Sequence, residues 1–461
     1  MSHKEVTSSS ARQVALQVLV KIEEAGAFSN IQLNKSLQEA SLTRADAGLV
    51  TEIVYGTISR KLTIDHILNQ CVAKGVKKLQ LWVHQLLRLS VYQIIWLDRI
   101  PAHAVVNEAV KIAKKKGHQG ISGMVNGVLR NIIRQQESFI PDKLEGKNEV
   151  ETLSIRYSFP VWLVKHFVSE YGSELAEQIL HSSNIPPHSS IRVNTTKVQQ
   201  AVLIDKLSEQ QIIAKPSLLA ADGLVVEQGG HLAANELFNQ GYYSIQDESS
   251  MLVAEVLAAK PNMRVLDACA APGGKAMHIA ERMHGKGTIY ANDLYEHKAL
   301  LIKQQAERLG LFNIEVSASD AALLDRAYEP ESFDAVLLDA PCSGLGVIKR
   351  KPEIKWTKQQ QDIEEIAKIQ TNLLDVVSRL VKTGGSLVYS TCTLAKQENE
   401  LQLERFLAAH PQFQLDPNWD DSLLDRLRHA GVINESFKGY IQLLPHQANS
   451  DGFFIARLIK R

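Results

Sequence analysis

Between residues 264 and 392 the sequence alternates short apolar runs with amphipathic segments, and this alternation restricts the possible folds more than any other feature. The apolar runs have the length and β-branched content of buried strands, and the amphipathic segments have helical spacing. Strands are predicted at the start of 264–274 and over 288–294, 313–320, 334–341 and 384–392, and helices over 275–285, 296–310 and 359–381. Strands that alternate with such helices form crossover connections, which predicts an α/β domain with a parallel sheet covered on both faces. Ligands of such sheets bind at the carboxyl ends of the strands.

A glycine turn follows the first of these strands. The run DACAAPGGK (267–275) ends a strand and begins a helix, where small residues let the backbone approach a ligand and helix amides attract an anion. It has neither the P-loop spacing nor the GxGxxG pattern of dinucleotide sites. Asp293, at the end of the second strand, is placed to bind ribose hydroxyls. These features predict S-adenosyl-L-methionine; tight packing of the turn and a solvated Asp293 are the alternative.

Two of the four cysteines follow the ends of buried strands. Cys342 comes after the run AVLLDAP and Cys392 after LVYST, at the edge where a ligand would bind. The cysteines form no CxxC pair, so neither a disulfide framework nor a metal site is expected. If the two strands are neighbours, about 5 Å apart, both thiols face one pocket.

A thiolate in such a pocket suits one reaction in particular. Carbon 5 of cytosine is a poor nucleophile until a thiolate adds to carbon 6, which makes the ring an enamine able to accept a methyl group at carbon 5. Asp339, beside the ring, could bind its exocyclic amine and N3. The residues alone do not say which cysteine attacks. As an alternative, both cysteines are small buried apolar residues.

The N-terminal part of the chain is helical and basic. Residues 1–140 hold 18 Lys and Arg against 10 Asp and Glu, whereas the whole chain is neutral, so this part is expected to face a polyanion such as nucleic acid. Helical periodicity covers the ranges 11–26, 46–70 with a break near Gly56, 79–97, 102–117 and 121–136. The nearly apolar range 79–97 is predicted to be the buried central helix.

Three domains are expected in a chain of 461 residues. The boundaries are predicted as 1–145 for the helical domain, 146–235 for a small α+β linker module and 236–461 for the α/β domain. The linker module has a predicted helix over 161–180, a strand over 189–196 and a helix over 198–210. No apolar run is long enough to span a membrane, and the first 13 residues have no apolar signal core, so a cytoplasmic protein is expected.

Three motifs, DACAAPGGK (267–275), LLDAPCSG (337–344) and YSTCT (389–393), resemble those of the RNA cytosine-C5 methyltransferases. The resemblance implies a Rossmann-like methyltransferase domain in which Cys392 is the nucleophile and Cys342 aids product release. In DNA cytosine methyltransferases the Pro-Cys cysteine attacks instead. The implied cofactor positions are Cys269, Ala270, Ala271, Pro272, Gly273, Gly274, Lys275, Asp293, Asp320 and Asp339. Asp320 departs from the family pattern, because it lies in SASDAALL where a Gly-Asp-x-Arg turn is usual.

The resemblance extends to other segments. Residues 239–257 are similar to the family's segment before the cofactor motif, and residues 157–164 together with 189–197 are similar to its linker module. The loop 346–356 looks like the one that follows the Pro-Cys motif. Its RNA-binding candidates are Lys349, Arg350 and Lys351 for phosphates and Trp356 for stacking, with a solvated basic loop as the alternative.

The helical block, especially 102–117 and 124–134, resembles the NusB family of RNA-binding domains. A NusB-like domain joined to this catalytic domain is the layout of a bacterial family of small-subunit rRNA methyltransferases. It implies a monomer that acts on naked or partly assembled 16S rRNA, at cytosine 967 by the family's name. The rival interpretations are a non-catalytic RNA-binding assembly factor, C5 methylation of another RNA, and DNA methylation.

Overall fold

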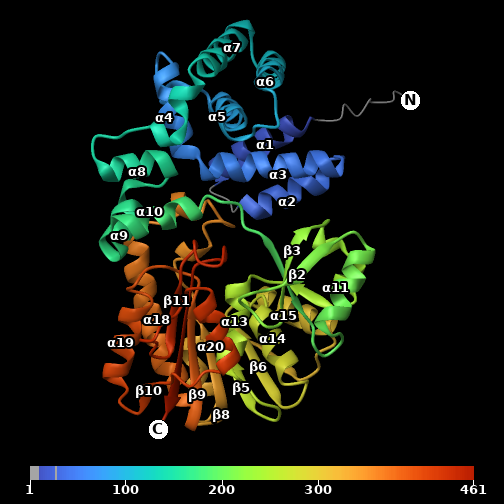
Figure 1. Cartoon of the computed structure of the whole chain (residues 1–461), viewed down its shortest axis with the longest axis vertical. Helices are drawn as coiled ribbons and strands as arrows, with labels where there is room; N and C mark the ends of the chain where they lie inside the picture. The colour runs from blue at the N-terminus through green and yellow to red at the C-terminus, as the bar shows by residue number, and fades with distance from the viewer. Residues whose placement is uncertain (1–9, 26–28) are drawn as a thin grey trace. The chain divides into compact units, whose positions relative to one another are not determined.

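The computed structural model describes residues 10–25 and 29–461, so the polar residues 1–9 and Gly26 lie outside the described residues. The chain forms two compact units, which Figure 1 shows coloured along the sequence. One unit runs to Asn184 and includes Arg350–Lys358; the other contains Ile185–Lys349 and Gln359–Arg461. The three sequence-based domain boundaries stay a prediction. In the described ranges, no helix combines the length and apolar character needed to cross a membrane.

The first unit is helical, as predicted. Its N-terminal helices are α1 (Ala11–Ala25), α2 (Ser29–Glu39), α3 (Arg44–Ser59), α4 (Lys61–Cys71), α5 (Leu81–Trp96), α6 (Ala102–Lys116) and α7 (Gln119–Arg134). Helix α5 is the buried central helix, because nearly all its side chains from Val83 to Ile94 are shielded from solvent. The break between α3 and α4 falls at Arg60, so the break predicted near Gly56 is wrong. Gly56 lies against the ring of Tyr92, where an added Cβ would be 1.9 Å from Cζ; the glycine makes room for that ring inside the helix.

Three further helices complete this unit: α8 (Glu149–Tyr157), α9 (Val161–Tyr171) and α10 (Ser173–Ser182). The single helix predicted over 161–180 is wrong, because the chain turns at Gly172, whose φ is +79°. The inserted segment Arg350–Lys358 contains the short helix α17 (Ile354–Thr357).

The second unit begins with a four-stranded antiparallel sheet, which confirms the α+β character of the linker module. The sheet has the order β2-β3-β1-β4 and consists of β1 (Ser189–Val193), β2 (Ile213–Pro216), β3 (Gly223–Gln228) and β4 (Tyr243–Ile245). Helix α11 (Gln200–Glu209) buries Leu203 and Leu207 in the same small core as Ile191 and Val193 of β1.

The large sheet of the second unit has the order β10-β12-β9-β8-β5-β6-β7, and β11 also pairs with β12. Its strands are β5 (Arg264–Asp267), β6 (Thr288–Asp293), β7 (Ile314–Ala318), β8 (Phe333–Asp339), β9 (Val381–Thr391), β10 (Phe413–Leu415), β11 (Tyr440–Leu443) and β12 (Phe453–Lys460). Strands β5 to β9 are parallel, as predicted, but β12 runs antiparallel to β9. The sheet is therefore mixed and extends beyond the parallel strands that the sequence indicated.

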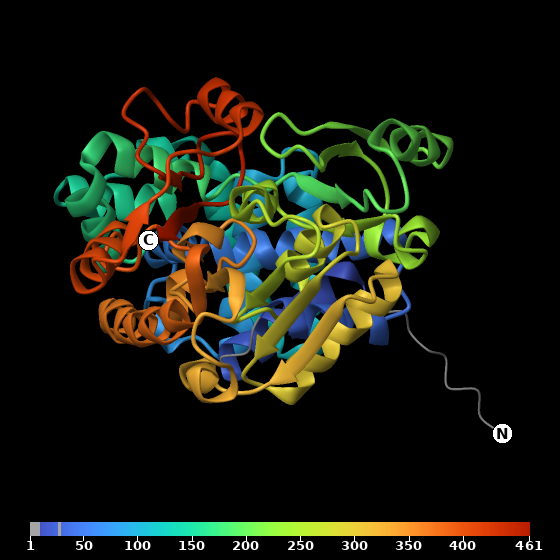
Figure 2. The same cartoon turned by 90° about the horizontal axis from the view of Figure 1, so that it is seen from below.

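Helices cover both faces of this sheet, as the views in Figures 1 and 2 show. The covering helices include α13 (Glu248–Leu257), α14 (Gly274–Arg282), α15 (Glu296–Leu309), α18 (Gln360–Leu380), α19 (Glu400–Ala409) and α20 (Asp421–His429). Successive strand residues enter different cores: Val265 packs with α13 and α14, whereas Leu266 packs with α18. Burial on both faces explains why the parallel strands are continuous apolar runs rather than alternating ones.

Candidate active site

The two strand-end cysteines are in contact. Strands β8 and β9 are parallel neighbours with Asp339 opposite Ser390, as the sequence analysis supposed. Cys392 directly follows β9, and Cys342 lies three residues beyond the end of β8. Their Sγ atoms are 3.4 Å apart. Two residues 50 positions apart in the sequence thus form one dithiol pair at the carboxyl edge of the sheet, where ligands of such folds bind.

The thiol of Cys342 keeps its proton at neutral pH. Its hydrogen bond with Cys392, its burial and the nearby charge of Glu398 all raise its pKa well above the ordinary value. The pKa of Cys269 is also raised, first by burial and then by Asp267. The thiol of Cys269 is thus protonated and unreactive at neutral pH.

A carboxylate–ammonium pair lies beside the cysteines. Lys275 Nζ donates a hydrogen bond to Asp339 Oδ2 at 2.7 Å, and Ser390 Oγ donates to Asp339 Oδ1 at 2.8 Å. Burial lowers the pKa of Lys275, but Asp339, together with Cys392 and Asp267, raises it above its ordinary value overall. Lys275 is therefore a cation that is hydrogen-bonded to Asp339 and lies close to Cys392.

The glycine turn joins β5 to α14 by a chain of backbone hydrogen bonds. Ala270 N–H donates to the carbonyl of Asn292, and Gly273 N–H donates to that of Ala270, each at 2.7 Å. Gly273 has a φ of +105°, a conformation that a side chain would strain. Helix α14 begins at the next residue, so its first amides lie directly beside the turn.

Three further acidic residues at the carboxyl ends of β5, β6 and β7 occupy different environments. Asp293 Oδ2 accepts a hydrogen bond from the amide of Ala271 at 3.3 Å, which ties the end of β6 to the turn. Asp267 is fully buried, and burial, reinforced by Asp339, raises its pKa to about 8. Asp320 is exposed and its Oδ1 accepts a hydrogen bond from the amide of Ala322. The predicted cofactor contacts of Asp293 and Asp320 stay predictions.

The predicted RNA-binding residues are divided between the two units. Lys349 Nζ donates to the carbonyl of Pro445 at 2.8 Å and to Asn449 Oδ1 at 3.1 Å. Trp356 belongs to the helical unit, where its Nε1 donates to the carbonyl of Ile58 at 2.9 Å. Lys351 is exposed and Arg350 is partly buried. Their roles in RNA binding stay predictions, and the contacts of Trp356 do not support the stacking role.

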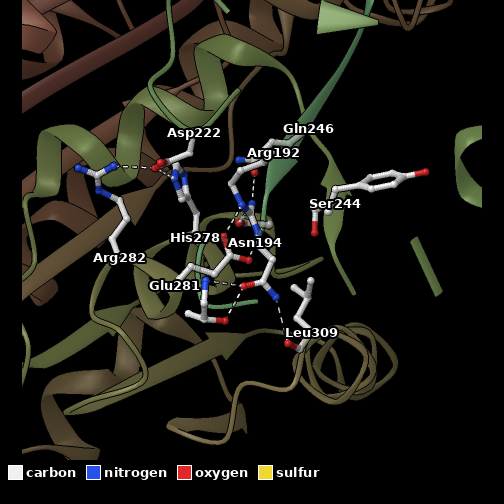
Figure 3. A network of polar contacts seen from close by, with 12 residues as sticks. Arg192, Asn194, Asp222, Ser244, Gln246, His278, Glu281, Arg282 and Leu309 are labelled. Carbon is white, nitrogen blue, oxygen red and sulfur yellow. Dashed lines mark hydrogen bonds and ion pairs between the residues drawn. The ribbon is translucent and has the colours of Figure 1, made fainter. Parts of the chain in front are cut away.

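The sequence analysis missed a buried ionic network behind the glycine turn, drawn in Figure 3. Arg192 of β1 is fully buried; its Nε and Nη2 donate to the two carboxylate oxygens of Glu281 at 2.8 and 2.9 Å. Its Nη1 donates to the carbonyl of Gly274 at 2.7 Å and also to Gln246 Oε1. Arg192 therefore connects the small sheet to the residue that begins α14. The only signal in the sequence was a charged residue at an inward-facing strand position.

The same helix is held at a second point. His278 Nε2 and Arg282 Nη1, both on α14, lie 2.9 and 2.6 Å from Asp222 Oδ2. Burial lowers the pKa of His278 to about 4, so this histidine is neutral at pH 7 and donates its hydrogen bond. Both partners hold the pKa of Asp222 well below its usual range despite its burial. Figure 3 shows this cluster next to the Arg192–Glu281 pair.

Comparison with known proteins matches these parts of the chain to described families. Residues 254–459 match the family described as 16S rRNA methyltransferase RsmB/F. Residues 9–134 match the NusB family, and residues 159–233 match the ferredoxin-like domain of RsmF/B-like methyltransferases. The predicted NusB-like helical domain and the predicted α+β module are thereby confirmed.

Individual relatives extend over nearly the full length. The probable ribosomal RNA small subunit methyltransferase B of Bacillus subtilis (strain 168) is 43% identical over 452 residues, which cover 98% of this chain and 99% of that protein. The crystal structure of PH0851 is 28% identical, with a TM-score of 0.80, and the match covers 98% of this chain and 99% of that one. The structure of NSun6 from Pyrococcus horikoshii with SFG is 24% identical and covers 66% of this chain and 99% of that one; its TM-score of 0.57 shows a shared fold. The chain accordingly belongs to the RsmB/F family of small-subunit ribosomal RNA methyltransferases and is an RNA methyltransferase.

Proposed function

We propose that this protein transfers a methyl group from S-adenosyl-L-methionine to carbon 5 of a cytosine in 16S rRNA, at position 967 as the family's name implies. The observation that carries the proposal is the 3.4 Å contact between the Cys342 and Cys392 thiols, beside the Asp339–Lys275 pair. A pair of thiols beside a carboxylate suits a nucleobase that must be activated by covalent addition of a thiolate. The same chemistry could act on another RNA, and the family membership favours 16S rRNA.

The residues around the glycine turn fit S-adenosyl-L-methionine. The first amides of α14 suit its carboxylate, and Asp293, which is bonded to the amide of Ala271, suits its ribose. The carboxyl oxygens of Asp267 are buried beneath the turn and have no side-chain partner with good geometry, which leaves polar atoms for a ligand or a water. The bound cofactor would supply an electrophilic methyl group.

The remaining steps belong to the protein's own residues. The thiolate of Cys392 forms a bond with carbon 6 of the cytosine, and the electron pair displaced from the ring double bond becomes available at carbon 5. The Asp339 carboxylate accepts a hydrogen bond from the exocyclic amine of the base and, in the adduct protonated at N3, from N3–H, and Lys275 orients that carboxylate. After methylation a base removes the carbon-5 proton, the sulfur–carbon bond breaks and the ring double bond is restored. Cys342, which keeps its own proton, aids this release.

The RNA must reach this pocket with its base exposed. A cytosine inside a helix has to be flipped out before a thiol can contact carbon 6, so naked or partly assembled rRNA is the proposed substrate. The basic helical unit would add phosphate contacts. An rRNA substrate places the reaction in the cytoplasm.

The test of the proposed function is to map 5-methylcytosine in 16S rRNA from cells with and without this gene. One site that disappears on deletion and returns with the wild-type gene, but not with the Cys392→Ala gene, is the expected result. A site that also returns with Cys392→Ala would contradict the covalent mechanism. Unchanged methylation combined with defective small subunits would instead indicate a non-catalytic assembly factor.

A further inference from the structure

The loops that carry the two cysteines share one buried carboxylate, that of Glu398. Glu398 Oε2 accepts hydrogen bonds from the amide of Ser343 at 2.9 Å and from Gln370 Nε2 at 3.0 Å. Glu398 Oε1 accepts from Ser343 Oγ at 2.5 Å and from Thr393 Oγ1 at 3.4 Å. Ser343 directly follows Cys342, and Thr393 directly follows Cys392. One side chain therefore binds the neighbours of both thiols.

The residues that precede the cysteines belong to the same network. Gln370 Nε2, which binds Glu398, also donates to the carbonyl of Pro341 at 2.9 Å. Thr391 Oγ1 donates to Asn399 Oδ1 at 2.6 Å, and Asn399 is the residue next to Glu398. Each cysteine is thus held from both sides by groups centred on Glu398, which bind the neighbouring residues rather than the thiols.

The burial of Glu398 argues against a simple packing role. Its side chain is fully buried, and no salt bridge to it occurs within residues 10–25 and 29–461. Removing a carboxylate from water without a cation is costly unless hydrogen bonds replace the lost hydration. The Ser343 amide, the Ser343 hydroxyl and Gln370 Nε2 are three donors to the two oxygens, and Thr393 Oγ1, which also bonds to Ser343 Oγ at 2.7 Å, lies at the longer distance of 3.4 Å. Burial raises the pKa of Glu398 and these hydrogen bonds lower it, so they offset part of the cost of burying the carboxylate. A contact that only packed two loops together could be made by apolar side chains, without the free-energy cost of burying a carboxylate.

We propose that Glu398 is a positioning residue that holds the Cys342 and Cys392 loops together and thereby keeps the two thiols in contact. Its effect on methyl transfer rests on the proposed roles of the two cysteines. Its effect on the distance between the thiols does not, because that distance can be probed without RNA.

The probe for thiol proximity is phenylarsine oxide, whose arsenic bridges two adjacent thiols with release of water. In the wild-type chain we expect capture of one arsenical, counted by intact-protein mass and lost in both Cys342→Ser and Cys392→Ser. Glu398→Gln keeps the size of the side chain but places an amide donor against the Ser343 amide. We expect this variant to capture the arsenical at least about tenfold more slowly, the effect of losing one or two charged hydrogen bonds.

The second measurement is methyl transfer to a 16S rRNA transcript. In Glu398→Gln we expect kcat to fall about tenfold to a hundredfold, while KM for S-adenosyl-L-methionine changes less than about twofold. Glu398→Ala should show the larger loss of kcat. The matched control is Glu400→Gln, a partly buried carboxylate two residues away whose Oε2 has no hydrogen-bond partner; it should keep both the capture rate and kcat.

The two measurements separate this proposal from the proposed function. Glu398→Gln with wild-type capture would overturn the positioning role, whatever its methylation activity. Slow capture in Glu398→Gln together with an active Cys392→Ala enzyme would uphold the positioning role and refute the covalent mechanism. A melting temperature of Glu398→Gln near that of the wild type shows that the variant is folded, so the test does not depend on Glu398→Ala.

Discussion

At the scale of single residues, the two cysteines differ in their surroundings although their sulfur atoms touch. Cys342 lies where a thiol hydrogen bond, burial and the charge of Glu398 raise its pKa. Cys392 lies close to Lys275 and contributes to the raised pKa of that lysine. The raised pKa of Cys342 agrees with the proton-bearing role that the family resemblance implies for it, and attack by Cys392 stays a proposal.

Replacing Cys392 tests the attacking role. In Cys392→Ala we expect methyl transfer to fall at least about a thousandfold, the order of magnitude expected when a covalent nucleophile is removed, because the neighbouring thiol of Cys342 keeps its proton. Binding of S-adenosyl-L-methionine, measured by calorimetry, should stay within about twofold of the wild type. Full activity in this variant would exclude the covalent mechanism.

Replacing Cys342 tests the release role. In Cys342→Ala the adduct between Cys392 and the RNA should form but break slowly, because the group that aids release is gone. The expected observation is a protein–RNA species that survives a denaturing gel and vanishes in the Cys342→Ala, Cys392→Ala double variant. Normal turnover with no such species would remove the release role from Cys342.

At the scale of secondary structure elements, the start of α14 depends on an ion pair from another sheet. Arg192 of β1 binds Glu281 of α14 and the carbonyl of Gly274, so the small sheet and the glycine turn are joined. Both charged side chains are almost fully buried. A buried ion pair contributes little more to stability than apolar side chains of similar size would. Losing one partner, however, leaves an uncompensated charge in the interior.

Removing the carboxylate of Glu281 should therefore destabilise the second unit. In Glu281→Gln we expect the free energy of unfolding of the second unit to fall by about 3–5 kcal/mol. The affinity for S-adenosyl-L-methionine should fall as well, because the turn loses its support. The control is Lys215→Ala, which removes the largely exposed Lys215–Glu227 pair of the same small sheet. That change should cost no more than about 1 kcal/mol in urea unfolding. An equal decrease in the free energy of unfolding in Glu281→Gln and Lys215→Ala would contradict the supporting role of the buried pair.

At the scale of the whole molecule, the segment Arg350–Lys358 belongs to the helical unit although it follows the Pro-Cys motif in the sequence. Lys355 is fully buried there, and its Nζ donates to the carbonyl of Ser59 at 2.9 Å and to Asn184 Oδ1 at 2.8 Å. Deleting residues 1–140 would remove Ser59 and leave this ammonium group without one of its partners. Such a deletion therefore tests stability together with RNA binding, and surface substitutions are the cleaner test.

The lysines at the end of α6 provide those substitutions. Lys114 and Lys115 are exposed, so Lys114→Gln and Lys115→Gln remove charge without disturbing the core. If each lysine contacts a phosphate, the slope of log K against log salt for 16S rRNA binding should decrease by about 0.7–0.9 per substitution. Binding of S-adenosyl-L-methionine should be unchanged. An unaltered slope would mean that this part of α6 does not contact RNA.

The sequence alone determined the features that depend on local periodicity and on spacing along the chain. These are the parallel strands β5 to β9, the helical N-terminal unit, the glycine turn at Gly273 and the placement of Cys342 and Cys392 after neighbouring strands. Each can be read in a window of a few residues, because helix and strand periods, turn residues and strand ends are local properties.

Only the tertiary structure decided which distant residues meet. Glu398 and Arg192 look like ordinary charged residues in the sequence, and their roles come from partners that lie 55 and 89 residues away. Gly56 was mistaken for a helix end because the Tyr92 ring that it accommodates belongs to another helix. The hydrogen-bond partner of Trp356, the carbonyl of Ile58, is 298 residues away, so nothing in the local sequence indicated that contact. Burial and pairing are set by the packing of whole elements, so a short stretch of sequence carries no sign of them.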